Sequence, residues 1–147
     1  MNWIFGFNFV NVAIKIMNYN LPLHFSELPV YQKAIDILVL SRSISTYLNQ
    51  DLKYLNADGS EDPHIYFTGD IIQQSTNLAP QIINAEQESC SDKKNKYFES
   101  LDRLTTRLYR NCKRLEMANS NGRDYLPILR GELRKFRKLK QHWMMTL

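Results

Sequence analysis

The stretch LDRLTTRLYRNCKRL, residues 101 to 115, decides the fold of this chain. Apolar residues recur three or four positions apart through it and one turn before it, at Tyr97, Leu101, Leu104, Leu108, Cys112 and Leu115. An α-helix has about 3.6 residues per turn, so this spacing places them on one side of a helix. The other side carries a row of four arginines, Arg103, Arg107, Arg110 and Arg114. The stretch therefore predicts a helix with a core-facing side and a basic side.

Three further segments show the same apolar periodicity. We expect the first helix over residues 26–55 with Ser26 as its N-cap, and the second from Asp62 to about residue 88 with Pro63 at its first helical position. The fourth is expected to begin at Asp124 and to keep an apolar side as far as Trp143, which we interpret as a core or interface anchor. Four long helices with short links predict an all-α fold, an antiparallel up-down four-helix bundle.

Two positions disturb this regular pattern. Pro80 lies inside the second helix, where proline removes the hydrogen bond to the carbonyl of Thr76 and crowds that turn. We therefore expect the second helix to be kinked at Pro80, or to break in two. In the link before the fourth helix, Asn121 or Gly122 is expected to adopt the left-handed conformation that ends a helix.

Length and composition limit the class of protein. The chain has 147 residues, enough for one domain, and its five Gly and five Pro do not form the repeated turns of an all-β fold. No run reaches the roughly 18 apolar residues of a membrane span. Cys90 and Cys112 show no pairing pattern, which favours reduced thiols and a cytoplasmic location.

The first 20 residues are apolar but interrupted by Asn2, Asn8, Asn11 and Lys15. They lack the order of a signal peptide, in which positive charge precedes the apolar run. We interpret residues 1–20 as a leader or poorly ordered extension, with Met17 a possible true start, and residues 21–147 as a single bundle domain. Alternatively, the segment packs on the bundle or in the groove of a partner.

Charge is unevenly divided along the chain. Residues 101–147 hold 12 Lys/Arg against 4 Asp/Glu, a net charge of +8, whereas residues 1–100 hold 7 against 11, a net charge of −4. Eight of the 12 basic residues are Arg, whose forked donors suit phosphate. The sequence therefore predicts contact with the phosphate backbone of RNA or DNA. The candidate residues are Arg103, Arg107, Arg110, Lys113, Arg114, Arg130, Arg134, Lys135, Arg137, Lys138 and Lys140.

Other interpretations of the basic face stay open. One alternative is that the basic face is simply solvated. Another is that it is neutralised by the acidic first half of the chain or by an acidic protein partner. Contact with anionic lipid through residues 1–16 is a further alternative, although we expect no membrane partner.

Catalytic and metal-binding patterns are not visible in the sequence. The string Glu-x-x-His occurs once, ending at His64, whereas a di-metal bundle needs it on two helices. His24 and His142 do not share helical spacing with His64, and no Gly-rich phosphate loop or nucleophile motif is present. We expect no enzyme activity and no cofactor, and we interpret the carboxylates that might suggest acid–base chemistry as solvated: Asp70, Glu86 and Glu88.

Residues 28–143 resemble the accessory variability determinant family, the small four-helix proteins encoded beside the reverse transcriptase of diversity-generating retroelements. The resemblance is carried by LPVYQK at residues 28–33, YFTGD at residues 66–70, the Arg-rich segment around residues 104–115, and the terminal Trp143. A related group, the four-helix proteins of ribosomal RNA intervening sequences, shares the first of these motifs but matches the second helix only at Pro80 and Ile83.

The resemblance implies a non-catalytic accessory protein that binds RNA or DNA and docks a reverse transcriptase. It also implies a homo-oligomer, a pentamer of four-helix protomers. The alternative, implied by the related group, is a protein-interaction scaffold with a basic face and no nucleic-acid role.

Overall fold

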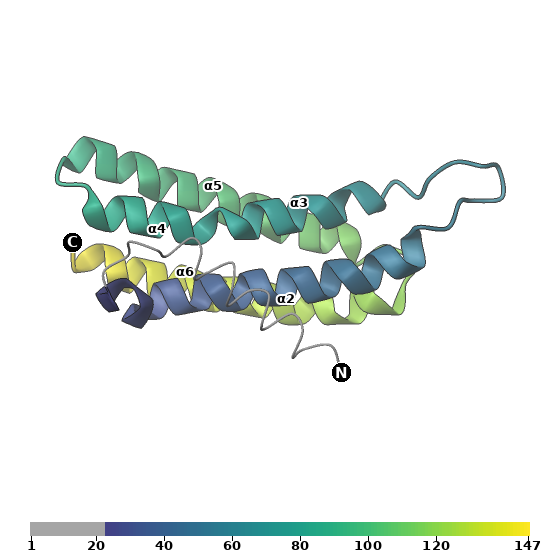
Figure 1. Cartoon of the computed structure of the whole chain (residues 1–147), viewed down its shortest axis with the longest axis horizontal. Helices are drawn as coiled ribbons and strands as arrows, with labels where there is room; N and C mark the ends of the chain where they lie inside the picture. Colours follow the sequence, from purple (N-terminus) through teal and green to yellow (C-terminus); the bar gives the residue numbers. More distant parts are fainter. Residues whose placement is uncertain (1–22) are drawn as a thin grey trace.

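The computed structural model describes residues 23–147, and all regular structure in this range is helical (Figure 1). Two short 3₁₀ helices and five α-helices follow one another: η1 (Leu23–Glu27), α2 (Pro29–Leu52), α3 (Ile65–Thr76), α4 (Leu78–Gln87), α5 (Ser91–Leu115), η2 (Asn121–Tyr125) and α6 (Leu126–Met145). The all-α prediction is confirmed for these residues. The predictions about residues 1–20, including Met17 as a start, lie outside the described range and stay predictions.

The helices pack side by side as a bundle. α2 packs mainly against α3 and α6, while α5 packs against α3, α4 and α6. Figure 1 shows α2 lying along α6 and the pair α3 and α4 lying along α5, with the C-terminus near the start of α2. Every long helix therefore turns one side toward its neighbours and another toward solvent.

One cluster of buried side chains joins all five α-helices. On α5, the predicted core residues Leu101, Leu108, Cys112 and Leu115 are fully buried, while Leu104 and Tyr97 pack partly buried against the cluster. Burying one such aliphatic side chain stabilises the fold by about 1.5–3 kcal/mol. The fully buried large side chains contributed by the other helices are Ile37, Leu48, Ile71, Leu78, Ile82, Leu126, Leu129, Leu133 and Phe136.

Trp143 belongs to this core, in line with its interpretation as an anchor. Its side chain is buried and meets the ring of Phe98 edge to face, with centroids 5.4 Å apart. Its indole N–H donates a hydrogen bond to Glu86. Through these contacts Trp143 links the end of α6 to α4 and the start of α5.

Of the two outcomes expected from Pro80, the break is the one observed: the second helical segment divides into two helices at Asn77, three residues before Pro80, and no kink lies at Pro80 itself. α3 ends at Thr76 and α4 begins at Leu78. Proline disturbs the turn that precedes it, because it cannot donate to the carbonyl four residues earlier and its ring crowds that carbonyl. That carbonyl belongs to Thr76, where α3 ends, and Pro80 itself lies in the first turn of α4.

Two predicted helix starts were wrong. α2 begins at Pro29 after the 3₁₀ turn η1, so Ser26 is not its N-cap. Asp62 instead accepts a hydrogen bond from the backbone N–H of His64, and the regular helix α3 begins at Ile65 rather than at Pro63. In both places a tight turn replaces the first turn of the expected helix.

The link between α5 and α6 also differs from prediction. Neither Asn121 nor Gly122 has a positive φ; among the described residues only Gly59 does. Asp124 does not cap α6, because residues 121–125 form η2, which Ser120 caps by accepting from the N–H of Gly122. Gly122 is required there for space: a Cβ on it would lie 2.6 Å from Cδ1 of Tyr47.

We expect Gly122→Ala to destabilise the protein. The added methyl must displace the Tyr47 ring and crowd Ser120, which lies 3.2 Å from the same position. Overpacking of a buried site costs about 1–3 kcal/mol. Urea unfolding followed by circular dichroism measures this loss.

Gly69→Ala is the matched control. A Cβ at Gly69 in α3 meets nothing within 4 Å, so alanine should stabilise the helix by about 0.5–1 kcal/mol through its higher helix propensity. Equal unfolding midpoints for the two variants would show that Tyr47 does not restrict position 122.

Candidate nucleic-acid interface

The predicted arginine row of α5 lies on the side of the helix that faces away from the core. Arg103, Arg107, Arg110 and Arg114 are all exposed, whereas the apolar side of the same helix is buried. Arg103 has one weak partner, Glu99, at 4.0 Å, and both side chains are largely in solvent. Among the residues described, the remaining three have no carboxylate within 4.0 Å. These charges are therefore available to an outside partner.

Arg114 also packs against a neighbouring helix. Its guanidinium lies over the ring of Phe67 in α3, 5.1 Å from the centroid, and donates a hydrogen bond of 3.3 Å to the side-chain oxygen of Asn111. A guanidinium held over an aromatic ring keeps its charge while its orientation is restricted. Arg114 is thus the most ordered member of the row.

A second group of cations surrounds Tyr109 between α5 and α6. The Lys113 ammonium lies 5.2 Å from the ring centroid, and the guanidinium groups of Arg130 and Arg137 lie 5.7 and 5.6 Å from it. Arg130 also approaches the phenol oxygen at 3.5 Å. Arg134 lies four residues after Arg130 and three before Arg137, and therefore on the same side of α6. We call Tyr109, Lys113, Arg130, Arg134 and Arg137 the Tyr109 cluster.

The nearby positive charges shift the pKa of the Tyr109 phenol. Hydrogen bonding from Arg130, and then from Arg134, lowers the pKa of Tyr109 from its usual value, because positive neighbours favour the phenolate. The pKa of Arg130 is raised by its hydrogen bonds to Tyr109 and to Glu116. The Nε of Arg130 lies 2.6 Å from Glu116, so this arginine is largely occupied within the protein.

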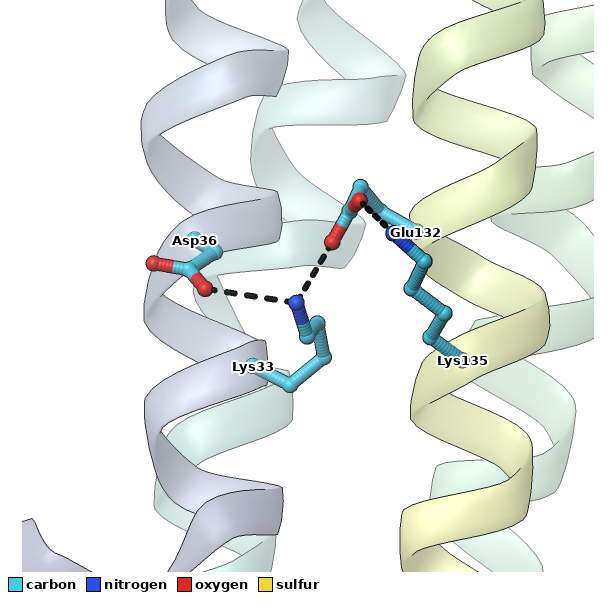
Figure 2. Close-up of polar contacts among 4 residues, drawn as sticks. All are labelled: Lys33, Asp36, Glu132 and Lys135. Atoms are coloured by element: carbon cyan, nitrogen blue, oxygen red, sulfur yellow. Dashed lines mark hydrogen bonds and ion pairs between the residues drawn. The ribbon is translucent and has the colours of Figure 1, made fainter.

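Another predicted residue, Lys135, belongs to an ion-pair network that connects α6 to α2. Figure 2 shows Glu132 between Lys135 of its own helix and Lys33 of α2, with Asp36 on the far side of Lys33. The Lys33 ammonium lies 2.7 Å from Glu132, and Lys135 lies 3.0 Å from it. The hydrogen bond that the Lys33 ammonium donates to Glu132 lowers the pKa of Glu132 and raises the pKa of Lys33. Lys135 therefore supports the bundle.

Lys140 lies inside the bundle, in contrast to its predicted place on a binding face. Its side chain is only 7% exposed and pairs with Asp102 of α5. Burial lowers the pKa of Lys140. Position 140 falls on the same side of α6 as Phe136 and Trp143, which are buried in the core, so its spacing in the sequence already favoured burial.

The predicted set thus divides into two parts. Arg103, Arg130, Lys135 and Lys140 have carboxylate partners; the pair of Arg103 is weak and exposed, whereas the other three hold helices together or brace α6. The residues free of any carboxylate within 4.0 Å, in the part of the chain described, are Arg107, Arg110, Lys113, Arg114, Arg134, Arg137 and Lys138.

Tyr109 was not predicted from the sequence, although a signal was present. It lies four residues before Lys113 and two positions after Arg107, on the flank of α5 between the core side and the arginine row. An aromatic residue at that flank, facing a second basic helix, is placed to hold cations from both.

In residues 23–147, no three His, Cys, Asp or Glu side chains are grouped as metal ligands would be, and none of the helices is long and apolar enough to cross a membrane. Glu86 and Glu88 accept hydrogen bonds from Trp143 and from the N–H of Cys90, so both serve the fold. Burial raises the pKa of the Cys112 thiol to about 12, which keeps it protonated at neutral pH.

Comparison of the chain with family models, curated proteins and solved structures finds no match.

Glu132→Gln should cost about 1 kcal/mol at pH 7, because it removes a partly buried charge partner of Lys33. The pKa of Glu132 is lowered in the fold, so its contribution is present above its unfolded pKa and is lost as pH falls through the folded value. The pKa of Lys33 is raised, so its contribution is lost as pH rises through the folded value, above the ordinary 10.5. Denaturation at several pH values should show a constant difference from wild type between about pH 6 and 9 that shrinks at both extremes. A difference independent of pH down to pH 2 would contradict the ion-pair account.

If the basic sides of α5 and α6 bind nucleic acid, Lys140→Met should leave the affinity and its salt dependence unchanged, because the ammonium of Lys140 is buried and paired with Asp102. Methionine of similar length keeps the core filled, and replacing a buried charge in this way is often neutral or stabilising. The control is Lys138→Met, which removes an exposed charge two residues away and should reduce the salt slope on single-stranded RNA by about 0.7. Equal losses in the two variants would mean that Lys140 leaves the bundle to reach its partner.

Proposed function

We propose that this chain is a non-catalytic accessory protein that binds the phosphate backbone of RNA or DNA through the basic sides of α5 and α6. The observation that carries the proposal is the set of seven basic side chains in this region with no carboxylate within 4.0 Å among the described residues. They occupy two helices that pack against each other, so their positive charges reinforce one another along α5 and α6.

Electrostatics favours a partner for this surface over a solvated one. Like charges three or four residues apart on a helix repel by a few tenths of a kcal/mol per pair. The carboxylates that offset positive charge nearby, Asp102, Glu116 and Glu132, are engaged with Lys140, Arg130 and Lys135. Repulsion among the remaining arginines therefore destabilises the free protein. Binding to phosphate groups reduces this repulsion and releases the counterions of the nucleic acid.

Sequence-independent contact is the expected mode. Arg side chains on the outside of a bundle meet phosphate and sugar, and the exposed row presents no loop or β-ribbon that enters a groove to read bases. Affinity should accordingly depend strongly on salt and weakly on sequence.

Two finer parts of the proposal, the homo-oligomer and the docking of a reverse transcriptase, rest on the resemblance to accessory variability determinants. The cytoplasmic location rests on the cysteines that show no pairing pattern, and the antiparallel up-down topology rests on the links between helices. The short links between α4 and α5 and between α5 and α6 support the topology, since a short link leaves consecutive helices adjacent.

A protein-interaction scaffold is the second candidate. It is favoured by exposed apolar side chains near the link between α5 and α6, where Met117 is 77% and Ile128 54% exposed. In that case the basic surface would meet an acidic protein and RNA would not bind at physiological salt.

The test is binding of a single-stranded RNA and of duplex DNA to the full chain, measured by fluorescence anisotropy from 50 to 300 mM salt. Arg107, Arg110, Arg134 and Arg137 changed together to Gln should lower the slope of log affinity against log salt by about 2 to 3 on single-stranded RNA, since contacts to three or four phosphates are lost and each contributes about 0.7. The matched control changes four lysines elsewhere to Gln and should retain the slope: Lys53, Lys93, Lys94 and Lys96.

Two results would overturn the proposal. One is an affinity that does not change with salt, and the other is an equal loss in the arginine variant and the lysine control. Circular dichroism of both variants establishes that they are folded before binding is compared.

A further inference from the structure

The Tyr109 cluster differs from the arginine row because its cations converge. Lys113, Arg130 and Arg137 all lie within 5.7 Å of one ring centroid. The distance between any two of these cationic groups therefore cannot exceed the sum of their distances from the ring centroid. In the row on α5, by contrast, successive side chains point outward from points spread along the helix axis.

This convergence is not balanced by negative charge. The cluster contains four cationic side chains, and in the described part of the chain only Glu116 lies within 4.0 Å of any of them, on Arg130. Tyr109 holds the cations by its ring face and its phenol oxygen, but a neutral ring does not cancel their charge. Three of the four cationic side chains therefore have no carboxylate partner within 4.0 Å in the described residues, which favours the binding of an anion.

We propose that the Tyr109 cluster is a seat for a single phosphate group, bound by Arg134, Arg137 and Lys113 and organised by Tyr109. Two guanidinium groups offer paired N–H donors to two phosphate oxygens, and the lysine ammonium supplies a third donor. Arg130 is fixed by Glu116 and stays at the rear of the seat. Tyr109 is a positioning residue, because it holds the cations of both helices in one place.

The identity of the phosphate rests on the proposed function: in that setting it belongs to a nucleic acid, either at a 5′ end or within the backbone. A terminal phosphate carries two negative charges and a backbone phosphate one. The seat itself is tested first with inorganic phosphate, which needs no nucleic-acid binding at all.

The first experiment reports on Tyr109 directly. The full chain is labelled with 3-fluorotyrosine, and the ¹⁹F resonance of Tyr109, one of eight tyrosines, is assigned by its absence in Tyr109→Phe. Inorganic phosphate is then titrated at constant ionic strength, with chloride as the reference anion. The resonance of Tyr109 should shift and reach saturation, while the other tyrosine resonances stay in place.

Charge variants locate the seat. Arg134→Gln with Arg137→Gln should abolish the phosphate-dependent shift, whereas Arg103→Gln with Arg107→Gln, which removes the same charge from the outward row, should leave it intact. A Tyr109 resonance that does not respond to phosphate, or responds equally in both double variants, would overturn the proposal.

The second experiment uses 5′-phosphorylated and 5′-hydroxyl RNA of one sequence. Removing Arg134 and Arg137 should weaken binding by about tenfold or more and lower the salt slope by about 0.7, because the two arginines contact one phosphate. If the seat takes a terminal phosphate, the loss is confined to the 5′-phosphorylated RNA; if it takes a backbone phosphate, both RNAs lose equally. Unchanged affinity for both would count against the seat.

Tyr109 is tested by ring and hydroxyl separately. Tyr109→Leu removes the ring that holds the cations and should weaken binding of the same RNA, while Tyr109→Phe retains the ring and should restore most of it. If the wild-type chain does not bind RNA but its Tyr109 resonance still responds to phosphate, the proposed nucleic-acid function is contradicted and the phosphate seat is supported.

Discussion

Burial of the apolar side of α5 is the constraint on which the rest of the structure depends. Leu101, Leu108 and Leu115 are fully enclosed by the other helices, which fixes the rotation of α5 about its own axis. A helix that buries one side must expose the other. Because the leucines of α5 are buried, the arginine row on its other side faces solvent. The flank of α5 that carries Tyr109 lies against α6.

Charge pairing divides the basic residues of α6 by direction. Lys140 turns inward to Asp102, Lys135 turns to Glu132 in the network that also ties down Lys33, and the arginines at 130, 134 and 137 follow the border with α5. Breaking an ion pair that is partly shielded from water costs more than breaking an exposed one, because the remaining charge stays shielded without a partner. The same carboxylates are thereby taken away from the arginines, which leaves a surface of one sign. The basic residues that are paired within the bundle are therefore different from those that we propose to bind phosphate.

The fold followed from the sequence wherever periodicity was long and regular. The buried leucines of α5 and the anchor Trp143 were predicted because five turns of one pattern admit one rotation of the helix. The misplaced features, the cap at Ser26 and the conformation of Gly122, depend on tight turns and on the distance of one ring from one backbone atom, which spacing does not encode. For the candidate interface, the exposed arginines followed from the same pattern, but the burial of Lys140 and the gathering of cations at Tyr109 depend on how two helices meet.

The central claim, that phosphate meets the basic sides of α5 and α6, is tested most directly by footprinting lysines of the full chain with an acetylating reagent, with and without RNA, and reading each site by mass spectrometry. Lys113 and Lys138 should be protected by RNA, while Lys53, Lys93 and Lys96, which are equally exposed, should be acetylated as in the free protein. Protection of the second group with Lys113 and Lys138 left unprotected would contradict the account.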